Sequence, residues 1–357
     1  MKVLIMAGGT GGHIFPAMAV AQECEQRGWQ VRWLGSRRGM ESTLVPKMGF
    51  EFHALPVTAW HGGRLRKILA PLNLARALWA SIWYLRQEKP DAVIGFGGYA
   101  SAPGGVAALI LKTPLILHEQ NGVPGLTNRR LEKRAQRVLQ AFPGTFAAAH
   151  EVVGNPVRPQ LCEIERPGQR ALGQHNSLRV LVLGGSQGAE AINELMPKAL
   201  VEPGMAKRFE IWHQTGRGKS ERCAQQYLDK GVEATVVEFI DDMRAAYQWA
   251  DLVIARSGAS TVSELAAVGL YSLLIPYPWH EDKQQYKNAQ WLADAGAAEW
   301  FDQSELSAQR LAKRLQELSN QRNDLRQKAE CAWQLGVRDS AKRIVNVVNE
   351  LVKSDVA

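Results

Sequence analysis

The sequence predicts an α/β protein of two Rossmann-like domains, each built on a doubly wound parallel sheet. Three observations lead to this prediction. The 357 residues exceed the usual length of one domain. The chain opens with an apolar strand-like run, a glycine-rich turn and a helical pattern, and the same order starts again near residue 178. Further strand-like runs alternate with helical segments in both halves, as they do in parallel sheets.

The expected strands are short apolar runs bounded by turn residues. They cover residues 3–7, 30–34, 92–95 and 115–118 in the first half, and 179–183, 209–213, 236–239, 252–255 and 273–276 in the second. The polar stretch 159–177 is interpreted as a linker because it carries Pro167, Gly168 and Gly173. A closing helix is expected at 337–357, packed back on the first domain. The expected domains are therefore 1–158 with this helix, and 178–336.

The composition indicates a globular protein, with 46% hydrophobic and 22% charged residues. Its four cysteines are scattered without C-x-x-C spacing, which argues against a disulfide framework or a zinc cluster. The first apolar run is too short for a signal peptide, and no run reaches the roughly eighteen apolar residues that cross a bilayer. We therefore expect a cytoplasmic protein, with peripheral contact to a membrane left open.

The charge is concentrated in the first half. Residues 1–158 hold 19 Lys and Arg against 9 Asp and Glu, a net +10, whereas the remainder holds 24 against 26, a net −2. The basic half should face an anionic partner. No nucleic-acid motif accompanies the charge, so we expect phosphate-bearing substrates and anionic lipid rather than nucleic acid.

Three glycine-rich turns follow predicted strands, at 8–12, 95–105 and 184–189. Glycine lets the backbone approach a phosphate, and the helix that follows offers unpaired N–H groups. One such turn is equally consistent with ordinary tight turning, but three at strand ends favour a ligand site. A nicotinamide dehydrogenase is disfavoured, because G-x-G-x-x-G spacing is absent and the second strand runs into Gly35-Ser36 without a carboxylate.

A fourth candidate segment, 256–264, reads RSGASTVSE between a strand and a helix. Small hydroxyl residues and backbone N–H groups suit a diphosphate, and Glu264 is placed to accept the two hydroxyls of a ribose. The alternative is a helix N-cap with an acidic first turn. That alternative explains one serine and the glutamate but not the whole run.

Eight stretches, in order across almost the whole chain, carry a resemblance to a known family. They are GGTGGH at 8–13, GFGGYAS at 95–101, HEQNGVPGLTN at 118–128, VVGNPVR at 152–158, GGSQGA at 184–189, EFIDDM at 238–243, RSGASTVSE at 256–264 and DKQQYKNA at 282–289. Together they resemble the MurG family. This resemblance implies a GT-B glycosyltransferase fold with a cleft between the halves. It also implies inverting transfer of GlcNAc from UDP-GlcNAc to the MurNAc 4-hydroxyl of lipid I, undecaprenyl-pyrophosphoryl-MurNAc-pentapeptide, which forms lipid II in peptidoglycan synthesis.

The resemblance further implies the residues of the site. UDP-GlcNAc would be bound by Thr10, Gly11, Gly12, Asn121, Arg158, Ser186, Ile240, Ala259, Ser260, Thr261, Val262, Ser263, Glu264 and Gln285. The acceptor diphosphate would face the turns 8–12 and 97–105, with Gly97, Gly98, Tyr99 and Ser101. No cofactor is required and no metal site is expected. A divalent cation stays open, because Asp241 and Asp242 are adjacent rather than spaced as Asp-x-Asp at a strand end.

Three places depart from the family's pattern. Residues 58–63 replace the usual Gly-hydrophobic-Arg signature, Ala102 stands where glycine is common, and Tyr271 stands where proline is usual. The first two belong to acceptor-side segments, so the acceptor contacts are less defined than the donor contacts.

The transfer requires a base for the attacking hydroxyl. His13 is the leading candidate, because it closes the first glycine turn and its side chain titrates near neutrality when unperturbed. The alternative role for His13 is to cap the helix or to bind an acceptor phosphate. Glu119 is the second candidate base. Helix N-termini and Arg158 would stabilise the departing UDP.

Residues 64–87 read as a strongly apolar helix with aromatic and basic residues. In part it must pack on its own sheet. Its remaining apolar side chains suit an anionic membrane surface, because tryptophan and tyrosine lie beside arginine and lysine. The expected membrane contacts are Leu72, Leu78, Trp79, Ile82 and Trp83, with Tyr84 nearby and Arg64, Arg66, Lys67 and Arg76 around them. The expected location is the cytoplasmic face of the bacterial inner membrane.

Two other functions remain open from the sequence. A UDP-GlcNAc 2-epimerase of the same fold would need additional acid and base carboxylates and no membrane face. A non-catalytic nucleotide-sugar-binding membrane scaffold would need no base at all. Cell-wall synthesis and division proteins are further candidate partners, and the oligomeric state is left open.

Overall fold

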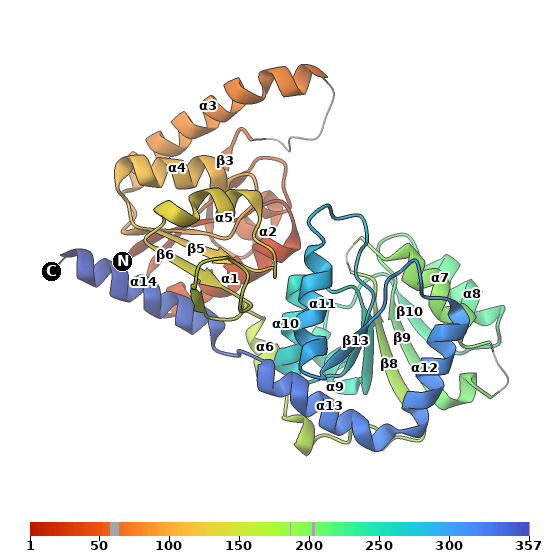
Figure 1. The fold of residues 1–357 in the computed structure, drawn as a ribbon. Helices are drawn as coiled ribbons and strands as arrows, with labels where there is room; N and C mark the ends of the chain where they lie inside the picture. Colours follow the sequence, from red (N-terminus) through yellow and green to blue (C-terminus); the bar gives the residue numbers. More distant parts are fainter. Residues whose placement is uncertain (58–63, 186, 202–203, 357) are drawn as a thin grey trace. The chain divides into compact units, whose positions relative to one another are not determined.

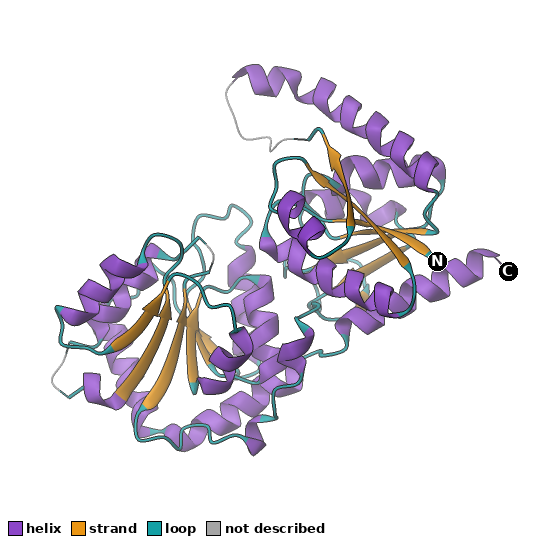
Figure 2. Ribbon diagram, turned by 180° about the vertical axis from the view of Figure 1, so that it is seen from behind, coloured by secondary structure: helices purple, strands orange, loops and turns teal. Residues whose placement is uncertain are grey.

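The computed structural model describes residues 1–57, 64–185, 187–201 and 204–356. Its contacts divide the chain into two units, Met1–Arg158 with Val337–Ala357, and Pro159–Gly336. Each unit is a parallel sheet with helices on both faces (Figures 1 and 2). The departure at 58–63 lies outside the described residues.

The first unit contains a seven-stranded parallel sheet in the order β3-β2-β1-β4-β5-β6-β7. The strands are β1 (Lys2–Met6), β2 (Gln30–Ser36), β3 (Glu51–Leu55), β4 (Ala92–Gly95), β5 (Leu115–Glu119), β6 (Arg137–Gln140) and β7 (Glu151–Val152). The strand order reverses between β1 and β4. Ligands of open parallel sheets bind at the carboxyl ends of such a pair, and the glycine turns 8–12 and 95–105 follow these two strands.

Alternating side chains of β1 separate the two cores of this unit. Val3 and Ile5 are fully buried on one face with α1 (Gly11–Gln26) and α14 (Ser340–Val356). Leu4 and Met6 are buried on the other face with α3 (Arg64–Glu88) and α4 (Ser101–Leu111). The remaining helices are α2 (Glu41–Lys47), α5 (Leu126–Leu131) and the 3₁₀ turn η1 (Glu132–Arg134).

The second unit contains a six-stranded parallel sheet in the order β10-β9-β8-β11-β12-β13. Its strands are β8 (Leu178–Leu183), β9 (Phe209–Gln214), β10 (Ala234–Val237), β11 (Leu252–Ala255), β12 (Ser272–Leu274) and β13 (Ala298–Trp300). Its helices are α6 (Pro159–Cys162), α7 (Glu190–Ala199), α8 (Ser220–Leu228), α9 (Met243–Trp249), α10 (Ala259–Val268), α11 (Gln284–Asp294), α12 (Ala308–Asn320) and α13 (Arg322–Leu335), with 3₁₀ turns η2 (Pro167–Gln169) and η3 (Ala206–Arg208). Here the order reverses between β8 and β11, which precede the turn 184–189 and the segment 256–264.

The stretch 159–177, interpreted above as a linker, is part of the second unit. Leu161, Ile164 and Leu172 are buried in it. Asp251 accepts hydrogen bonds from the backbone N–H groups of Gly173, at 2.7 Å, and Arg179, at 3.0 Å. The irregular spacing of these few apolar residues gives no periodic pattern, which is why the stretch reads as a linker.

The helix expected at the end of the chain forms as α14 and packs on the first unit. Ile344, Val345 and Val348 are fully buried in the core that contains Val3 and Ile5. The chain therefore returns to its first unit after completing the second.

Candidate functional site

The glycine turns 8–12 and 95–105 lie against each other in the first unit. A Cβ atom on Gly98 would clash with the backbone of Gly8, and the φ of Gly98 is +86°. A side chain there is therefore excluded both by space and by backbone conformation. Gly97, at φ +95°, lies beside the ring of His13, whose Cε1 is 3.1 Å from the place of a Cβ atom. The two turns thus form one backbone surface next to His13.

A buried carboxylate holds the turn 8–12 in place by accepting a hydrogen bond from its backbone. Glu41 is fully buried, and its Oε2 accepts a hydrogen bond from Gly9 N at 3.1 Å. Its Oε1 accepts from the N and Oγ of Ser36, at 2.9 Å and 2.6 Å. Glu41 is not recognisable from the sequence, because nothing in its local pattern indicates that it reaches the glycine turn.

The helix α1 begins directly after the first turn, as expected. Its N-cap residue Thr10 has an extended backbone and makes no side-chain capping hydrogen bond, and the first turn has no acidic residue. Unpaired N–H groups and the helix dipole make such a helix start suited to an anion. Gly11, Gly12 and His13 are half-buried.

The loop after β5 is organised by Glu119. This side chain is 1% exposed, and its oxygens accept from Asn121 N at 3.1 Å, Gly125 N at 3.0 Å and Asn128 Nδ2 at 2.9 Å. Those donors hold both carboxylate oxygens of Glu119 within the loop. The geometry supports Glu119 as a positioning residue for the loop that carries Asn121.

Residues 101–105, expected to belong to a turn that faces the acceptor diphosphate, form the first part of α4. Ser101 is fully buried, and its Oγ is within donating distance of two carbonyl oxygens, Met6 O at 2.9 Å and Gly97 O at 2.6 Å. Cβ atoms on Gly104 and Gly105 would clash with Met6 and Leu131. These two glycines therefore lie inside the helix for close contact with its neighbours, not in a turn that faces a diphosphate. Tyr99 is 36% exposed.

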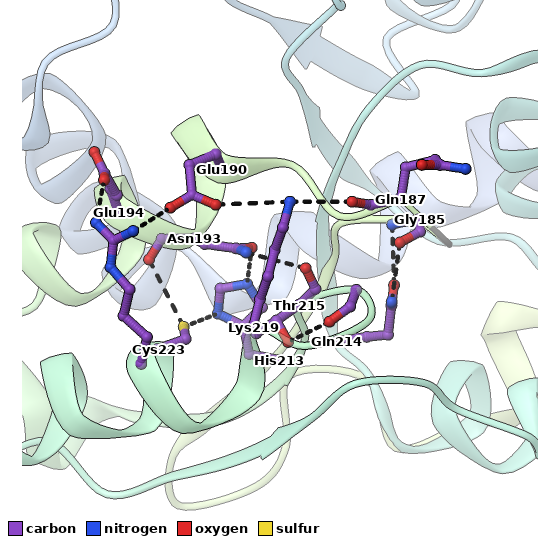
Figure 3. Close-up of polar contacts among 12 residues, drawn as sticks. Gly185, Gln187, Glu190, Asn193, Glu194, His213, Gln214, Thr215, Lys219 and Cys223 are labelled. Carbon is purple, nitrogen blue, oxygen red and sulfur yellow. Dashed lines mark hydrogen bonds and ion pairs between the residues drawn. The ribbon is translucent and has the colours of Figure 1, made fainter.

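In the second unit the turn 184–189 is held by side chains from β9 and α8, as Figure 3 shows. Gly188 has φ +74°, and a Cβ atom there would clash with Thr215 O. Lys219 Nζ donates to Gln187 O at 3.0 Å and lies 3.6 Å from Glu190 Oε2. Ser186, an expected donor residue, lies outside the described residues.

A buried polar cluster lies under this turn (Figure 3). Asn193 donates to Thr215 O at 3.0 Å, and its Oδ1 lies 3.1 Å from His213 Nε2. His213 Nδ1 lies 2.9 Å from the hydroxyl of Tyr227. Burial lowers the pKa of His213 to about 3, so the imidazole is neutral. The nearby thiol of Cys223 has its pKa raised to about 11 by burial, which makes it unreactive.

The N-terminus of α10 presents hydroxyl groups that have no partner in the protein. The Oγ atoms of Ser260 and Ser263 are buried and make no hydrogen bond. Gly258 is the N-cap in extended conformation, and no acidic residue lies in the first turn. One turn later, Glu264 Oε2 accepts from the Tyr247 hydroxyl at 2.9 Å. Buried polar groups normally have partners, so these hydroxyls indicate a polar ligand at this helix start.

The segment 256–258 is also tied to α11. Ser257 Oγ donates to Gln285 O at 2.8 Å, and Asn288 Nδ2 donates to Ser257 O at 3.1 Å. Gln285 Oε1 accepts from Tyr277 N at 2.9 Å. Arg256 donates to Ile275 O at 2.9 Å, and burial lowers its pKa. The start of α10 and the expected sugar-binding residue Gln285 are thereby fixed relative to each other.

The remaining residues expected to bind the donor lie after β10, in α10 and at the end of the first segment of the chain. Ile240 is 5% exposed and follows β10, whose neighbour β9 ends beside the turn 184–189. Ala259 and Val262 are buried in α10, and Thr261 is half-buried. Arg158 is the residue at which the chain leaves the first unit and enters the second. Among the residues that the structure describes, no group of three or more His, Cys, Asp or Glu side chains gathers as a metal site.

Comparison with known proteins assigns both halves of the chain. Residues 3–140 match the glycosyltransferase family 28 N-terminal domain, and residues 179–344 match its C-terminal domain. A protein from Shewanella loihica is 44% identical over 357 residues, which cover 99% of this chain and 98% of that protein. Its name is UDP-N-acetylglucosamine--N-acetylmuramyl-(pentapeptide) pyrophosphoryl-undecaprenol N-acetylglucosamine transferase. A protein of the same name from Proteus mirabilis is 45% identical over 359 residues, 99% of this chain and 98% of that one.

The crystal structure of Acinetobacter baumannii MurG decides the family. It superposes with a TM-score of 0.86 at 36% identity, covering 98% of this chain and 99% of that one. The chain belongs to the MurG family. The GT-B fold expected from the sequence is confirmed by this likeness and by the two family 28 domains.

One departure from the MurG family pattern, Tyr271, is explained by its surroundings. Tyr271 stands where the MurG pattern has proline, and its side chain is 1% exposed. Its hydroxyl donates to Glu299, which Arg314 also contacts, and Lys328 Nζ lies 4.8 Å from the ring centre. The residue is thus part of the packing between β12, β13 and the last helices of the second unit.

Proposed function

We propose that the chain transfers GlcNAc from UDP-GlcNAc to the MurNAc 4-hydroxyl of lipid I and so forms lipid II. The observation that carries this proposal is the first part of α10, where the buried hydroxyls of Ser260 and Ser263, which precede Glu264, lack partners. Those groups suit a diphosphate followed by a ribose. The relatives named above carry this activity in their names.

The donor is proposed to bind through the second unit. The helix start at Ala259 and the turn 184–189 would hold the diphosphate, while Glu264 would accept the ribose hydroxyls. The backbone of Ile240 would bind uracil, and Gln285 the hydroxyls of the sugar. Helix N-termini stabilise the negative charge that develops on the departing UDP, and the reaction calls for no cofactor.

The acceptor is proposed to bind through the first unit. The joined turns around Gly8 and Gly98 lie in the same unit as the start of α1, which has no side-chain cap. That surface suits a diphosphate. His13 is proposed as the base that takes the proton of the attacking hydroxyl, because it lies beside this surface.

A membrane contact is proposed over α3 and α4. Trp79 and Trp83 are 71% and 53% exposed, and Ile110 on the adjoining α4 is 53% exposed. Leu72 is exposed as well. Leu78 and Ile82, which the sequence analysis included, instead pack against the core with Ala77 and Leu85, and Tyr84 is buried. The helical period turns those residues toward the sheet.

Basic side chains accompany this apolar surface. Arg76, Arg129, Arg130, Lys133, Arg134 and Arg137 are exposed on α3 and on the segment from α5 to β6. Such a combination favours anionic lipid. No helix among the described residues is long and apolar enough to cross a bilayer. The proposed location is the cytoplasmic face of the inner membrane, where wall-synthesis and division proteins would be partners.

One incubation separates the proposed function from its alternatives. The full chain is mixed with UDP-GlcNAc and a soluble lipid I analogue, and the products are followed by mass spectrometry. Transfer should give a GlcNAc-MurNAc product and UDP in equal amounts. An epimerase would give UDP-ManNAc without acceptor, and a scaffold would give donor binding without product; either result would overturn the proposal.

A further inference from the structure

Three buried or half-buried side chains of the first unit form a connected hydrogen-bond chain that ends on His13. His118 Nε2 lies 2.9 Å from Gly154 O, and His118 Nδ1 lies 3.0 Å from Gln120 Nε2. Gln120 Nε2 also donates to His118 O at 3.1 Å. At the far end, Gln120 Oε1 lies 2.9 Å from His13 Nδ1. His118 and Gln120 are both fully buried.

The hydrogen positions in this chain follow from the donor and acceptor capacity of each group. Gly154 O can only accept, so His118 Nε2 must carry a hydrogen. Burial lowers the pKa of His118 to about 4, which keeps the ring neutral and leaves Nδ1 as an acceptor. The amide NH₂ of Gln120 must therefore face His118, and its carbonyl oxygen must face His13. That oxygen can only accept, so His13 Nδ1 must carry a hydrogen.

We propose that Gln120, oriented by His118, fixes His13 in the Nδ1–H tautomer and so reserves Nε2 as the proton acceptor of the transfer reaction. Gln120 and His118 act as positioning residues, and only His13 meets the substrate. The inference rests on the proposed function for the identity of the reaction. It goes beyond it in assigning a role to two residues outside the expected site and in naming the nitrogen that takes the proton.

In the proposed step, one displacement transfers GlcNAc while His13 takes up the proton. The acceptor hydroxyl oxygen forms a bond to the anomeric carbon of GlcNAc as the bond from that carbon to the phosphate oxygen breaks. The hydroxyl proton passes to His13 Nε2, and the electron pair of the broken bond leaves with UDP. The imidazolium that results keeps its Nδ1–H bond to Gln120 Oε1, so the ring need not turn during the step. A neutral amide orients the ring without adding a charge beside it.

The tautomer is measured directly by long-range ¹H–¹⁵N correlation on the full chain labelled with ¹⁵N-histidine, at a pH where His13 is neutral. The His13 signals are assigned by their loss in His13→Asn. Wild-type His13 should show a protonated Nδ1 and an unprotonated Nε2. An Nε2–H tautomer in the wild type would overturn the proposal, whatever the activity of the enzyme.

The near-isosteric Gln120→Met removes the acceptor. Its His13 should move toward the Nε2–H form that histidine favours in water, and kcat should fall about tenfold, within the contribution of a general base. The KM for UDP-GlcNAc should stay unchanged. Gln140→Met is the matched control, since Gln140 is a buried glutamine on β6 that donates to His150 O. It should leave the His13 tautomer and kcat as in the wild type.

The outcomes distinguish the inference from the proposed function. A changed tautomer with normal kcat in Gln120→Met overturns the catalytic half of the inference, while lipid II formation by that variant still supports the proposed function. An unchanged tautomer in Gln120→Met overturns the positioning half. Absence of any transfer by the wild type overturns the proposed function, and the tautomer measurement then still decides whether Gln120 fixes His13.

Discussion

Gln214 is joined to Gly185 by both ends of its side-chain amide. Its Oε1 accepts from Gly185 N at 3.0 Å, and its Nε2 donates to Gly185 O at 3.0 Å (Figure 3). The same Nε2 donates to Glu238 O at 2.8 Å. The glycine turn proposed for the donor phosphates and the segment before Ile240, proposed for uracil, are therefore connected by one side chain at the end of β9.

Gln214→Leu should weaken donor binding. The substitution removes three hydrogen bonds, and each contributes about 1 kcal/mol, so the KM for UDP-GlcNAc should rise about tenfold or more while kcat changes little. Steady-state kinetics with varied donor measure the effect. Gln225→Leu is the control, because the side chain of Gln225 on α8 is exposed and donates a hydrogen bond to Asp229. An equal KM for UDP-GlcNAc in both variants would contradict a role of Gln214 in donor binding.

Tyr247→Phe should show how Glu264 is positioned for the ribose. The lost hydroxyl donates to Glu264 Oε2 at 2.9 Å, and one hydrogen bond to a charged group contributes about 1.5–3 kcal/mol. We expect kcat/KM for UDP-GlcNAc to fall at least about fivefold, with the folded structure retained. Glu264→Gln should lower kcat/KM for UDP-GlcNAc further, since it removes the charged carboxylate that is proposed to accept hydrogen bonds from the ribose hydroxyls. A kcat/KM for UDP-GlcNAc that is the same in Tyr247→Phe and the wild type would show that Glu264 needs no such support.

The sequence predicted the strands that precede the site and the turns that follow them, because both are local patterns. Runs such as 92–95 and 252–255 are short, apolar and bounded by turn residues, and the structure has strands there. Strands β3, β6, β7 and β13 were not predicted, since they are short or carry polar residues. Gly98 was recognisable as part of a turn, whereas its contact with Gly8 depends on the pairing of β1 with β4.

The supporting residues could not be predicted, because their partners are distant in the chain. Glu41 reaches Gly9 over 32 residues, Gln214 reaches Gly185 over 29, and Gln120 reaches His13 over 107. A single glutamate or glutamine has no periodicity that would reveal such a contact. The stretch HEQN was noticed for the family resemblance, but only the fold brings its Gln120 to His13.

Glu41→Gln should destabilise the first unit. One amide oxygen can replace one carboxylate oxygen, but the amide NH₂ then faces the N–H of Gly9 or of Ser36, and a buried donor is left without an acceptor. Such a loss costs about 1–3 kcal/mol in the free energy of unfolding. Urea unfolding measures it. The control is Glu25→Gln, an exposed glutamate on α1. Equal unfolding midpoints for the two variants would argue against a supporting role for Glu41.

Acid should destabilise both units through buried neutral histidines. Burial lowers the folded-state pKa of His118 to about 4 and of His213 to about 3, against about 6.5 in an unfolded chain. Between these values the unfolded state binds the additional proton, so stability is full above about pH 6.5 and falls as the pH drops. From pH 7.5 to 5 each histidine should remove about 2 kcal/mol.

Urea unfolding at pH 7.5 and pH 5.0 tests this expectation. His213→Gln should be less stable than the wild type at pH 7.5 because it disturbs the contacts with Asn193 and Tyr227. It should nevertheless lose less stability on acidification, since one titrating group is gone. An acid-induced loss as large in the variant as in the wild type would assign the effect to other groups.

Trp79→Ala with Trp83→Ala should reduce binding to membranes. Both side chains are exposed on α3, and exposed aromatic side chains beside arginines insert at the lipid interface. We expect the double variant to sediment with phosphatidylglycerol vesicles at least about tenfold less than the wild type. Two aromatic side chains inserted into lipid should contribute more than about 1.4 kcal/mol to the free energy of membrane binding. Leu228→Ala is the control, because Leu228 is 70% exposed on α8 of the second unit.

Salt and lipid charge separate the two contributions to this binding. At low salt the wild type should sediment with anionic vesicles and much less with neutral phosphatidylcholine, because the exposed arginines and lysines of residues 129–137 require anionic headgroups. Raising the salt should weaken the binding by screening. Equal binding to neutral and anionic vesicles would contradict the electrostatic contribution. Unchanged binding of the double variant would contradict the aromatic one. Because both tryptophans lie outside the core, transfer to a soluble lipid I analogue should stay normal in either case.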